Sequence, residues 1–331
     1  MAQKLSDLIV CPREFTPLRE NGNHLVCESG HCYPLIDGVP VMLLEEASPT
    51  NDGFRWTLEQ AKGYAPPYPI YHPVNGIDTY VQEQIGSTNG HLYRRAINNL
   101  KRYPIPDLRL PDGPGKTLLD IGCNWGRWSI AAARKGYQVV GIDPSLDAVL
   151  AARRVARQLE LDINYLVADA RFLPFPDQSF DTVFSYSVLQ HLSKENVRLA
   201  LSSIKRVLKT PGLSLVQMPN RFGIRSIYKQ VKQTLRRRPD YGNTGEFHVR
   251  YWTPRELLEA FQTRIGPSSL SVDGFFGLGI QKTDTDLMPA HYRAVVHGSE
   301  LLRRTSKILS PLKYVADSLY IESQSLDSEV S

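Results

Sequence analysis

The sequence predicts an α/β protein, because short apolar runs alternate with helical patterns through the middle of the chain. Residues 117–129 read TLLDIGCNWGRWS, an apolar run that breaks at two glycines and continues as a helix. Further apolar runs of strand length follow at 137–142, 161–167, 179–185 and 213–218. Such alternation is typical of a parallel sheet that is covered by helices.

The glycine turn at Gly122 and Gly126 is the first candidate binding site. A strand that leads into a glycine turn at a helix N-terminus leaves backbone N–H groups pointing outward, and glycine lets a ligand approach the main chain. The spacing is not G-x-G-x-x-G, because Asn124 interrupts it. Asp120 lies inside the strand, and an acid there suits an ammonium group better than a pyrophosphate. The turn therefore predicts binding of S-adenosylmethionine.

Acidic residues end the second strand and follow the third. Asp143 comes about 20 residues after the glycine turn, where an acid accepts hydrogen bonds from both ribose hydroxyls. Asp169 is placed to accept from the adenine amino group. Ser193 is expected to cap the helix at 195–208. The predicted cofactor-binding residues are Asp120, Gly122, Cys123, Gly126, Asp143, Pro144, Asp169, Ala170 and Ser185.

Several segments resemble the class I S-adenosylmethionine-dependent methyltransferases in their order and spacing. They read LLDIGCNWGR, VVGIDPS, ADARFLPFPDQSFDTVFSYSVLQHL and RVLKTPGLSLV, and they span 115–220. Within that class they are similar to the methyltransferase type 11 domain of ubiquinone and menaquinone biosynthesis enzymes. The resemblance implies a seven-stranded Rossmann-like sheet with helical additions. Asn124, which tolerates left-handed backbone angles, and the bulky Trp125 depart from the family's loop and would narrow the methionine end of the pocket.

Two short knuckles near the start form a zinc-ribbon layout. Cys11 and Glu14 belong to the first, and Cys27, His31 and Cys32 to the second. With YPLIDGVPVML they resemble the small zinc-ribbon domain that precedes certain RNA and protein methyltransferases. The first knuckle of that domain usually reads Cys-Pro-x-Cys, and here Glu14 replaces its second cysteine. Zinc could take Cys11, Cys27 and either His31 or Cys32, with Glu14 as an oxygen ligand; the alternative is a ribbon without metal that its apolar strands hold together.

The expected domain organisation has four parts. Residues 1–46 form the zinc-ribbon-like β domain, and 47–87 form a linker in which the prolines favour extended chain over 47–75. Residues 88–285 form the methyltransferase domain, and 286–331 add a helical segment with a disordered tail.

Smaller elements are expected around this core. A helix over 91–102 would cover the cofactor, with Tyr80 and Tyr93 as lid residues. A hairpin of 268–273 and 275–282 would close the sheet.

A basic segment lies in the insertion at 221–245. Residues 221–240 carry seven Lys or Arg and one acid, a net charge of +6, whereas the whole chain carries +5. Apolar residues recur through it at helical spacing, so we expect a basic amphipathic helix. Three interpretations stay open: contact with a membrane surface or an anionic substrate, packing of the apolar side on the domain, and contact with RNA.

Composition limits the class of protein. An apolar content of 42% and a charged content of 22% predict a packed globular protein. No apolar run approaches the roughly 18 residues of a membrane span, and the N-terminus lacks the apolar core of a secretion signal. We therefore expect a cytoplasmic protein, or one peripheral to the inner face of a membrane, with its four cysteines reduced.

The expected reaction is methylation of an oxygen or carbon on a small or lipid-linked acceptor. N-methyltransferases of adenine or glutamine carry Asn/Asp-Pro-Pro-aromatic after the fourth strand, where this chain has Ser185-Tyr186-Ser187. His191 is a candidate general base or a structural residue. His248, like Arg250, is a candidate for the substrate pocket. The alternatives are a ribosomal-RNA base methyltransferase and a non-catalytic cofactor-binding scaffold.

Overall fold

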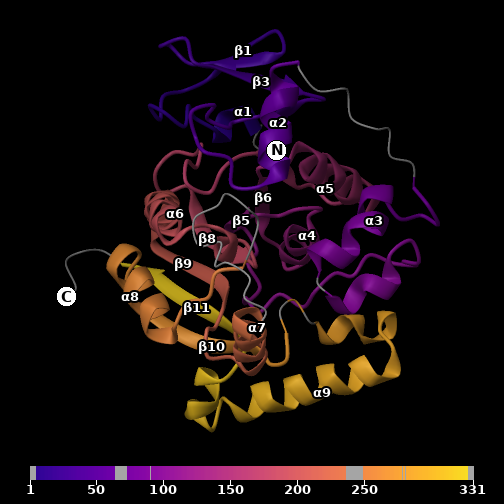
Figure 1. The fold of residues 1–331 in the computed structure, drawn as a ribbon. Coiled ribbons are helices and arrows are strands. Elements are labelled where there is room, and N and C mark those ends of the chain that lie inside the picture. Colours follow the sequence, from indigo (N-terminus) through magenta and orange to yellow (C-terminus); the bar gives the residue numbers. More distant parts are fainter. Residues whose placement is uncertain are drawn as a thin grey trace.

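The structure is a computed structural model of the 331-residue chain. It describes residues 5–63, 73–89, 91–235, 249–277, 279 and 281–326. Within these residues a seven-stranded sheet forms the centre of the molecule, and a small four-stranded sheet lies at the N-terminal end (Figure 1). This arrangement confirms the predicted fold class.

The large sheet has the strand order β10-β11-β9-β8-β5-β6-β7. Strands β5 to β9 are parallel, and β11 is antiparallel to both of its neighbours. The carboxyl ends of the parallel strands therefore meet at one edge, where ligands bind in sheets of this kind. The strands are β5 (Thr117–Ile121), β6 (Gln138–Asp143), β7 (Asn164–Val167), β8 (Phe180–Tyr186), β9 (Leu208–Pro219), β10 (Ser268–Gly274) and β11 (Ser318–Ser325).

Helices pack on this sheet and on one another. Among them α4 and α5 contact β6, whereas α6 and α8 contact each other and the strands β9 to β11. The predicted cap is present, because the Ser193 side chain accepts from Asn196 N, and Thr253 forms a capping box with Glu256 at the start of α8. The helices are α1 (Leu5–Leu8), α2 (Asp52–Ala61), α3 (Thr79–Thr88), α4 (Arg127–Ala133), α5 (Leu146–Gln158), α6 (Lys194–Val207), α7 (Ile224–Leu235), α8 (Pro254–Arg264) and α9 (Ala290–Thr305), with the 3₁₀ helices η1 (His91–Ala96), η2 (Leu189–His191), η3 (Lys282–Leu287) and η4 (Ser310–Tyr314).

The N-terminal ribbon joins the large sheet at its β7 edge. Its antiparallel strands are β1 (Arg19–Asn21), β2 (His24–Val26), β3 (Cys32–Ile36) and β4 (Val39–Pro40). Just after β4, Val41 forms a parallel bridge with Val167, and Met42 N donates to Val167 O at 2.8 Å. Ribbon residues and sheet residues belong to one hydrophobic cluster. The ribbon is therefore packed as an extension of the sheet.

The prediction of extended chain over 47–75 is wrong where α2 forms, and the expected linker at 47–87 also contains most of α3. Helix α2 begins because the Asn51 side chain accepts from Phe54 N at 2.8 Å, and Phe54 is fully buried. The expected helix at 91–102 is the short 3₁₀ helix η1 instead. Just after η1, Asn98 adopts a left-handed φ of 58°, and Leu100 N donates to Gln82 Oε1 of α3. The chain therefore turns back onto α3 instead of continuing as a helix.

The predicted hairpin at the end of the sheet is also wrong. The partner of β10 is β11, a strand from the C-terminal tail that lies between β10 and β9. The tail was expected to be a helical segment with a disordered end, but after α9 and η4 it forms the strand β11. Leu319 and Ile321 are fully buried, and pairing with two strands orders the segment. Strand β9 begins at Leu208, before the expected strand at 213–218, and its pairing with β8 shifts register near this start.

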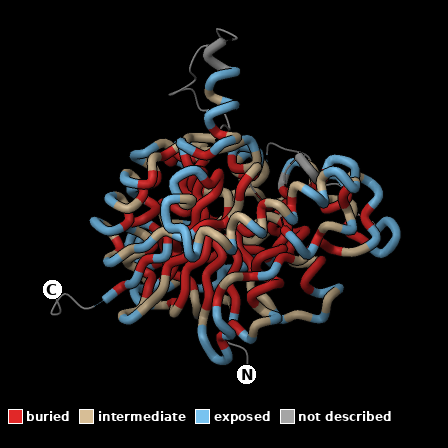
Figure 2. Tube along the Cα trace, turned by 90° about the horizontal axis from the view of Figure 1, so that it is seen from below, coloured by how far each residue is buried: buried red, intermediate tan, exposed pale blue. Residues whose placement is uncertain are grey.

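Helix α7 confirms the amphipathic helix in the basic segment and contradicts one interpretation of it. The apolar side chains of Ile227, Tyr228 and Val231 are 46%, 63% and 52% exposed, so this side does not pack on the domain. In Figure 2 the outer part of the helix projects from the body of the molecule, whereas its start is attached. Arg236, Arg237, Arg238, Asp240 and His248 lie outside the described residues. Among those described, no helix combines the length and the apolar character that crossing a membrane requires.

Candidate active site

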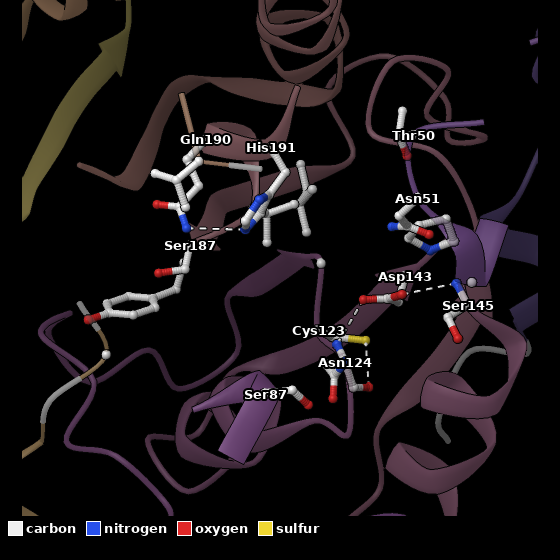
Figure 3. A pocket seen from close by; sticks show the side chains of 18 of the residues that line it. Thr50, Asn51, Ser87, Cys123, Asn124, Asp143, Ser145, Ser187, Gln190 and His191 are labelled. Carbon is white, nitrogen blue, oxygen red and sulfur yellow. Dashed lines mark hydrogen bonds between the residues drawn. The ribbon is translucent and has the colours of Figure 1, made fainter. Parts of the chain in front are cut away.

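A cavity of about 630 Å³ opens at the carboxyl edge of the parallel strands. Its volume is within the range of small-molecule sites. The loops after β5, β6, β7 and β8 form its floor, and α2, α3 and α7 contribute walls (Figure 3). The predicted site residues on this surface are Gly122, Cys123, Asp143, Pro144, Asp169, Ala170 and His191.

The glycine turn needs its glycines but does not present free N–H groups. A Cβ on Gly122 would lie 2.1 Å from Val188 Cγ2, and Gly126 has a φ of 87°. Asn124 adopts the left-handed conformation at φ 47°, as its residue type allows. The N–H groups of residues 122–126 all donate within the protein. The expectation of outward donors is therefore wrong at these positions, and the turn suits a sulfonium or ammonium better than a phosphate.

Asp143 is the acid at the tip of β6. Its Oδ1 accepts from Ser145 N at 2.9 Å, and its Oδ2 accepts from Asn124 N at 3.1 Å. Burial raises the pKa of the carboxyl to about 6, although both backbone donors oppose the shift. Each oxygen keeps a lone pair for a further donor. Two backbone donors therefore fix the carboxylate in place, and its contact with the ribose hydroxyls stays a prediction.

Asp169 has a partner that the sequence analysis missed. Arg171 donates to both carboxylate oxygens, from Nε to Oδ1 at 3.1 Å and from Nη2 to Oδ2 at 2.6 Å. The same guanidinium donates to Ser48 O at 2.7 Å. The ion pair holds Asp169 at the wall and links it to the segment that follows the ribbon.

Three predicted cofactor residues, Asp120, Gly126 and Ser185, are absent from the described wall of the cavity. Asp120 Oδ2 accepts from Ser129 Oγ at 2.6 Å, and burial raises the pKa of this carboxyl to about 7. Ser185 Oγ donates to Ile121 O at 3.0 Å. These residues shape the strand ends behind the wall, and the structure does not support direct contact of their side chains with a ligand.

The opposite end of the cavity carries His191 on η2. His191 Nε2 lies 3.2 Å from Gln190 Nε2, and an amide nitrogen only donates, so this pairing places the ring hydrogen on Nδ1. Arg250 does not line the described wall. Its guanidinium donates to His191 O and so fixes the end of η2. Of the two expected lid residues, Tyr80 lines the cavity and Tyr93 is buried against Asp284.

Other wall residues were not predicted. Thr50, Asn51 and Gly53 reach the cavity from the start of α2, and Arg225 and Lys229 reach it from α7. The Asn-Asp-Gly sequence at 51–53 was a signal for a helix cap, but it was assigned to a linker. The basic helix was recognised, but its periodicity did not show which side faces the cavity.

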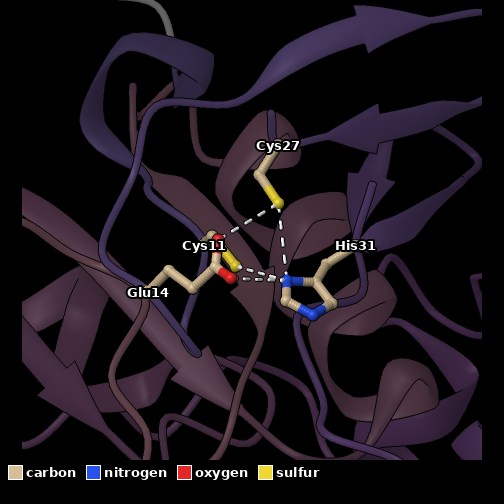
Figure 4. Close-up of side chains that lie close together, drawn as sticks. All are labelled: Cys11, Glu14, Cys27 and His31. Carbon is tan, nitrogen blue, oxygen red and sulfur yellow. Dashed lines mark hydrogen bonds and ion pairs between the residues drawn. The ribbon is translucent and has the colours of Figure 1, made fainter. Parts of the chain in front are cut away.

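A second cluster lies in the ribbon, away from the cavity (Figure 4). Ligand atoms of Cys11, Glu14, Cys27 and His31 all lie within 4.8 Å of one another. Cys32, the fifth predicted ligand, is exposed and outside this group. Of the two alternatives that the sequence left open, the structure therefore brings His31 to the site.

Comparison with known proteins agrees with this geometry. Residues 118–212 match the family described as a methyltransferase domain. The ubiquinone biosynthesis O-methyltransferase of Brucella ovis is 35% identical over 117 residues, which cover 34% of this chain and 46% of the relative. The enzyme of the same description from Agrobacterium fabrum is 33% identical over 131 residues, covering 40% and 50%. The chain thus spans about half the length of the curated relatives it matches.

Solved structures are similar at a coarser level. An S-adenosylmethionine-dependent methyltransferase from Methanosarcina mazei is 20% identical, and the match covers 66% of this chain and 94% of that one with a TM-score of 0.47. The strand order, the cavity and the family match define the central part of the chain as a class I methyltransferase domain. Its cofactor is S-adenosylmethionine, which the residues at the cavity fit.

Proposed function

We propose that the protein transfers a methyl group to an oxygen or carbon of a small or lipid-linked acceptor. The observation that carries this proposal is a single cavity whose wall holds Asp143 and Asp169 on the cofactor side and His191 on the other. S-adenosylmethionine supplies an activated methyl group on a sulfonium. The chain's own residues then have to position the acceptor and take up a proton.

His191 is the group proposed to take up that proton. Its Nε2 is the unprotonated ring nitrogen when Gln190 donates to it. Gln190 Oε1 is buried and has no hydrogen-bond partner among the described residues. Turning this amide over would present an acceptor to a protonated Nε2. The Gln190 side chain can therefore hydrogen-bond to His191 Nε2 both when the ring is neutral and when it is protonated.

Cations at the acceptor end support an anionic or lipid-linked acceptor. Arg225 and Lys229 lie one helical turn apart on the side of α7 that lines the cavity. Partial desolvation and the nearby Arg225 lower the pKa of Lys229. Asp317 Oδ1 accepts from Arg225 N at 2.7 Å and from Ser226 N at 3.0 Å, which fixes the start of the helix.

The outward side of the same helix supports contact with a membrane surface. We call this surface the apolar rim. Two segments lie together in it, because Asn220 Nδ2 donates to Tyr314 O at 2.8 Å and Ile224 N donates to Val315 O at 3.3 Å. The rim consists of exposed Phe222, Ile224, Ile227, Tyr228, Val231, Ile308, Leu309, Tyr314 and Val315.

The charge around the apolar rim suits an anionic bilayer. Residues 221–235 and 301–315 each contain four Lys or Arg and no acid. A basic residue near an anionic lipid surface contributes about 1 kcal/mol. We therefore propose that the rim rests on the membrane while the cavity behind it receives the acceptor.

The reaction is tested by following a labelled methyl group into separated lipid, small-molecule, RNA and protein pools. We expect label in the lipid or small-molecule pool, and His191→Gln should reduce transfer about 10²–10⁴-fold while cofactor affinity stays unchanged. Label in RNA alone would favour an RNA methyltransferase. Cofactor binding without transfer to any pool would favour a scaffold.

Membrane contact is tested by sedimentation with phosphatidylglycerol-containing vesicles. The double variant Tyr228→Ser, Val231→Ser should lose binding. Leu199→Ser is the matched control, because Leu199 is 45% exposed on α6, outside the rim. Equal binding by wild type and the double variant, or vesicle binding by none of the proteins, would refute this part of the proposal.

A further inference from the structure

The ribbon cluster combines buried sulfur ligands with nitrogen and oxygen donors. Cys11 is fully buried and Cys27 is 5% exposed, whereas the side chains of His31 and Glu14 are about one-third exposed. His31 Nδ1 lies 3.7 Å from Cys11 Sγ, 3.5 Å from Cys27 Sγ and 3.7 Å from Glu14 Oε1. Cys27 Sγ lies 3.8 Å from Glu14 Oε2. Donor atoms from two separate turns of chain, 11–14 and 27–31, thus surround one point.

These separations suit tetrahedral zinc. Zn–S bonds of about 2.3 Å and Zn–N or Zn–O bonds of about 2.1 Å give tetrahedral edges of roughly 3.4–3.8 Å. The four contacts given above are 3.5–3.8 Å long, with one Glu14 oxygen facing His31 and the other facing Cys27, and all the ligand atoms lie within 4.8 Å of one another. Two thiolates, an imidazole and a carboxylate are ligands that zinc accepts. The set departs from an all-cysteine ribbon only through its histidine and its glutamate.

Tyr33 supports the site from behind. Its buried hydroxyl lies 3.2 Å from Cys11 Sγ. Burial raises the pKa of this hydroxyl, so it is protonated and donates to a thiolate. Donors that orient a metal ligand in this way are a regular feature of zinc sites.

The ribbon is connected to the adenosine side of the cavity by a short path of contacts. Next to Cys11, Val10 N donates to Pro174 O at 2.9 Å, and Met42 N donates to Val167 O at 2.8 Å. Val167 is the last residue of β7, immediately before Ala168, Asp169 and Ala170 of the cavity wall. The ribbon therefore borders the strand end that carries Asp169.

The segment that follows the ribbon, from Ser48 into α2, forms part of the cavity wall. Ser48 O accepts from Arg171, the partner of Asp169. Thr57 Oγ1 of α2 accepts from Leu146 N at 3.0 Å. A Cβ on Gly53 would lie 2.8 Å from Ser145 Cβ, so α2 packs tightly on the turn that binds Asp143.

We infer that Cys11, Glu14, Cys27 and His31 bind one Zn²⁺, and that this ion holds the wall of the adenosine site in place. Zinc holds the turn at 11–14 against the turn at 27–31. The ribbon in turn positions the segment that runs from Ser48 into α2. The metal is structural, because all four positions are filled by the protein. This inference depends on the cofactor site and is independent of the acceptor.

The first experiment measures zinc per chain by elemental analysis of the full-length protein. Wild type and Cys32→Ser should each carry one equivalent, and Cys27→Ser should carry none. Cobalt exchanged into the wild type should show thiolate charge-transfer absorption. A Cys11–Cys27 disulfide in place of metal, or reduced protein that takes up no added zinc, would overturn the assignment.

A gain-of-affinity variant covers the case in which Cys27→Ser does not fold. Glu14→Cys supplies a third sulfur and should slow zinc release to a chelator relative to wild type. If the rates for Glu14→Cys, Cys32→Ser and wild type are equal, Glu14 is not a ligand and the four-residue site is wrong.

Calorimetry with S-adenosylmethionine tests the link to the cofactor site. Chelated wild-type protein that retains its circular dichroism should bind about tenfold more weakly, the value expected if the wall is ordered in roughly one molecule in ten. Restored zinc should restore affinity. Unchanged affinity in metal-free, folded protein would separate the metal from the cofactor wall and overturn that half of the inference.

Discussion

Replacing Asp143 with asparagine should weaken cofactor binding while leaving the fold intact. A charged acceptor lost from the ribose hydroxyls costs about 1.5–3 kcal/mol, or roughly 10–150-fold in affinity. The substitution has two opposite effects on the free energy of unfolding. Asparagine has one acceptor for the N–H groups of Ser145 and Asn124, where the carboxylate has two. Leaving one donor unsatisfied costs about 1–3 kcal/mol.

Removing the buried charge of Asp143 offsets the cost of the unsatisfied donor. A carboxyl whose pKa rises to about 6 from 3.8 destabilises the folded state by about 3 kcal/mol at neutral pH. This cost is fully present above about pH 6 and disappears as the pH falls through 3.8, because the folded state binds the proton more tightly. Asp143→Asn removes the cost, so its stability at pH 7 should lie within about 2 kcal/mol of wild type.

Calorimetry and urea unfolding from pH 4.5 to 8 measure both effects. Wild-type affinity for S-adenosylmethionine should fall below about pH 6 as Asp143 takes up a proton, and this contribution should be absent in Asp143→Asn. Burial and the nearby charge of Asp143 raise the pKa of Asp120 to about 7, so Asp143→Asn also lowers the pKa of Asp120, and the same comparison in an Asp120→Asn background isolates Asp143. Equal affinities at pH 7.5 would refute the ribose assignment.

Three further predictions concern stability. Gly126→Ala should cost about 2–5 kcal/mol, from a left-handed φ and from a Cβ placed 2.5 Å from Tyr165 Oη, and Tyr165→Phe in the same chain should recover part of it in urea unfolding. Thr253→Ala should cost about 0.5–2 kcal/mol by removing the cap of α8, whereas Thr253→Ser should be nearly neutral. Hydrogen bonds from Arg303 lower the pKa of Glu300 to about 2, so Glu300→Gln should cost about 1–3 kcal/mol at pH 7 and progressively less as the pH falls through 2; a loss that does not vary with pH would contradict this.

The cofactor half of the site was predictable because its signals are local. The turn at Gly122, the acid at Asp143 and the cap at Ser193 each depend on a few consecutive residues. Local geometry of this kind is encoded directly in residue type. The sequence therefore located the strand ends, although it did not distinguish the wall residues from Asp120, which lies behind them.

The elements that were missed depend on partners far along the chain. β11 becomes a strand because β9 and β10 bind it on both sides, and these lie about a hundred and about fifty residues earlier. Its own sequence, SLYIESQS, alternates too weakly to identify it. Likewise α2 is set by its fit against Ser145, and the proline content around it gave no sign of that contact.

The contrast between local signals and long-range contacts also explains why the sequence identifies the cofactor more readily than the acceptor. The acceptor end of the cavity is assembled from η2, from α7 and from Asp317 just before β11. These segments are joined by tertiary contacts alone, and the matched family region ends at residue 212, before two of the three. α7 is the informative element, because Lys229 faces the cavity while Tyr228 beside it is 63% exposed. One helix thus separates the acceptor end from the apolar rim, so a substitution on either side of it tests where the acceptor comes from.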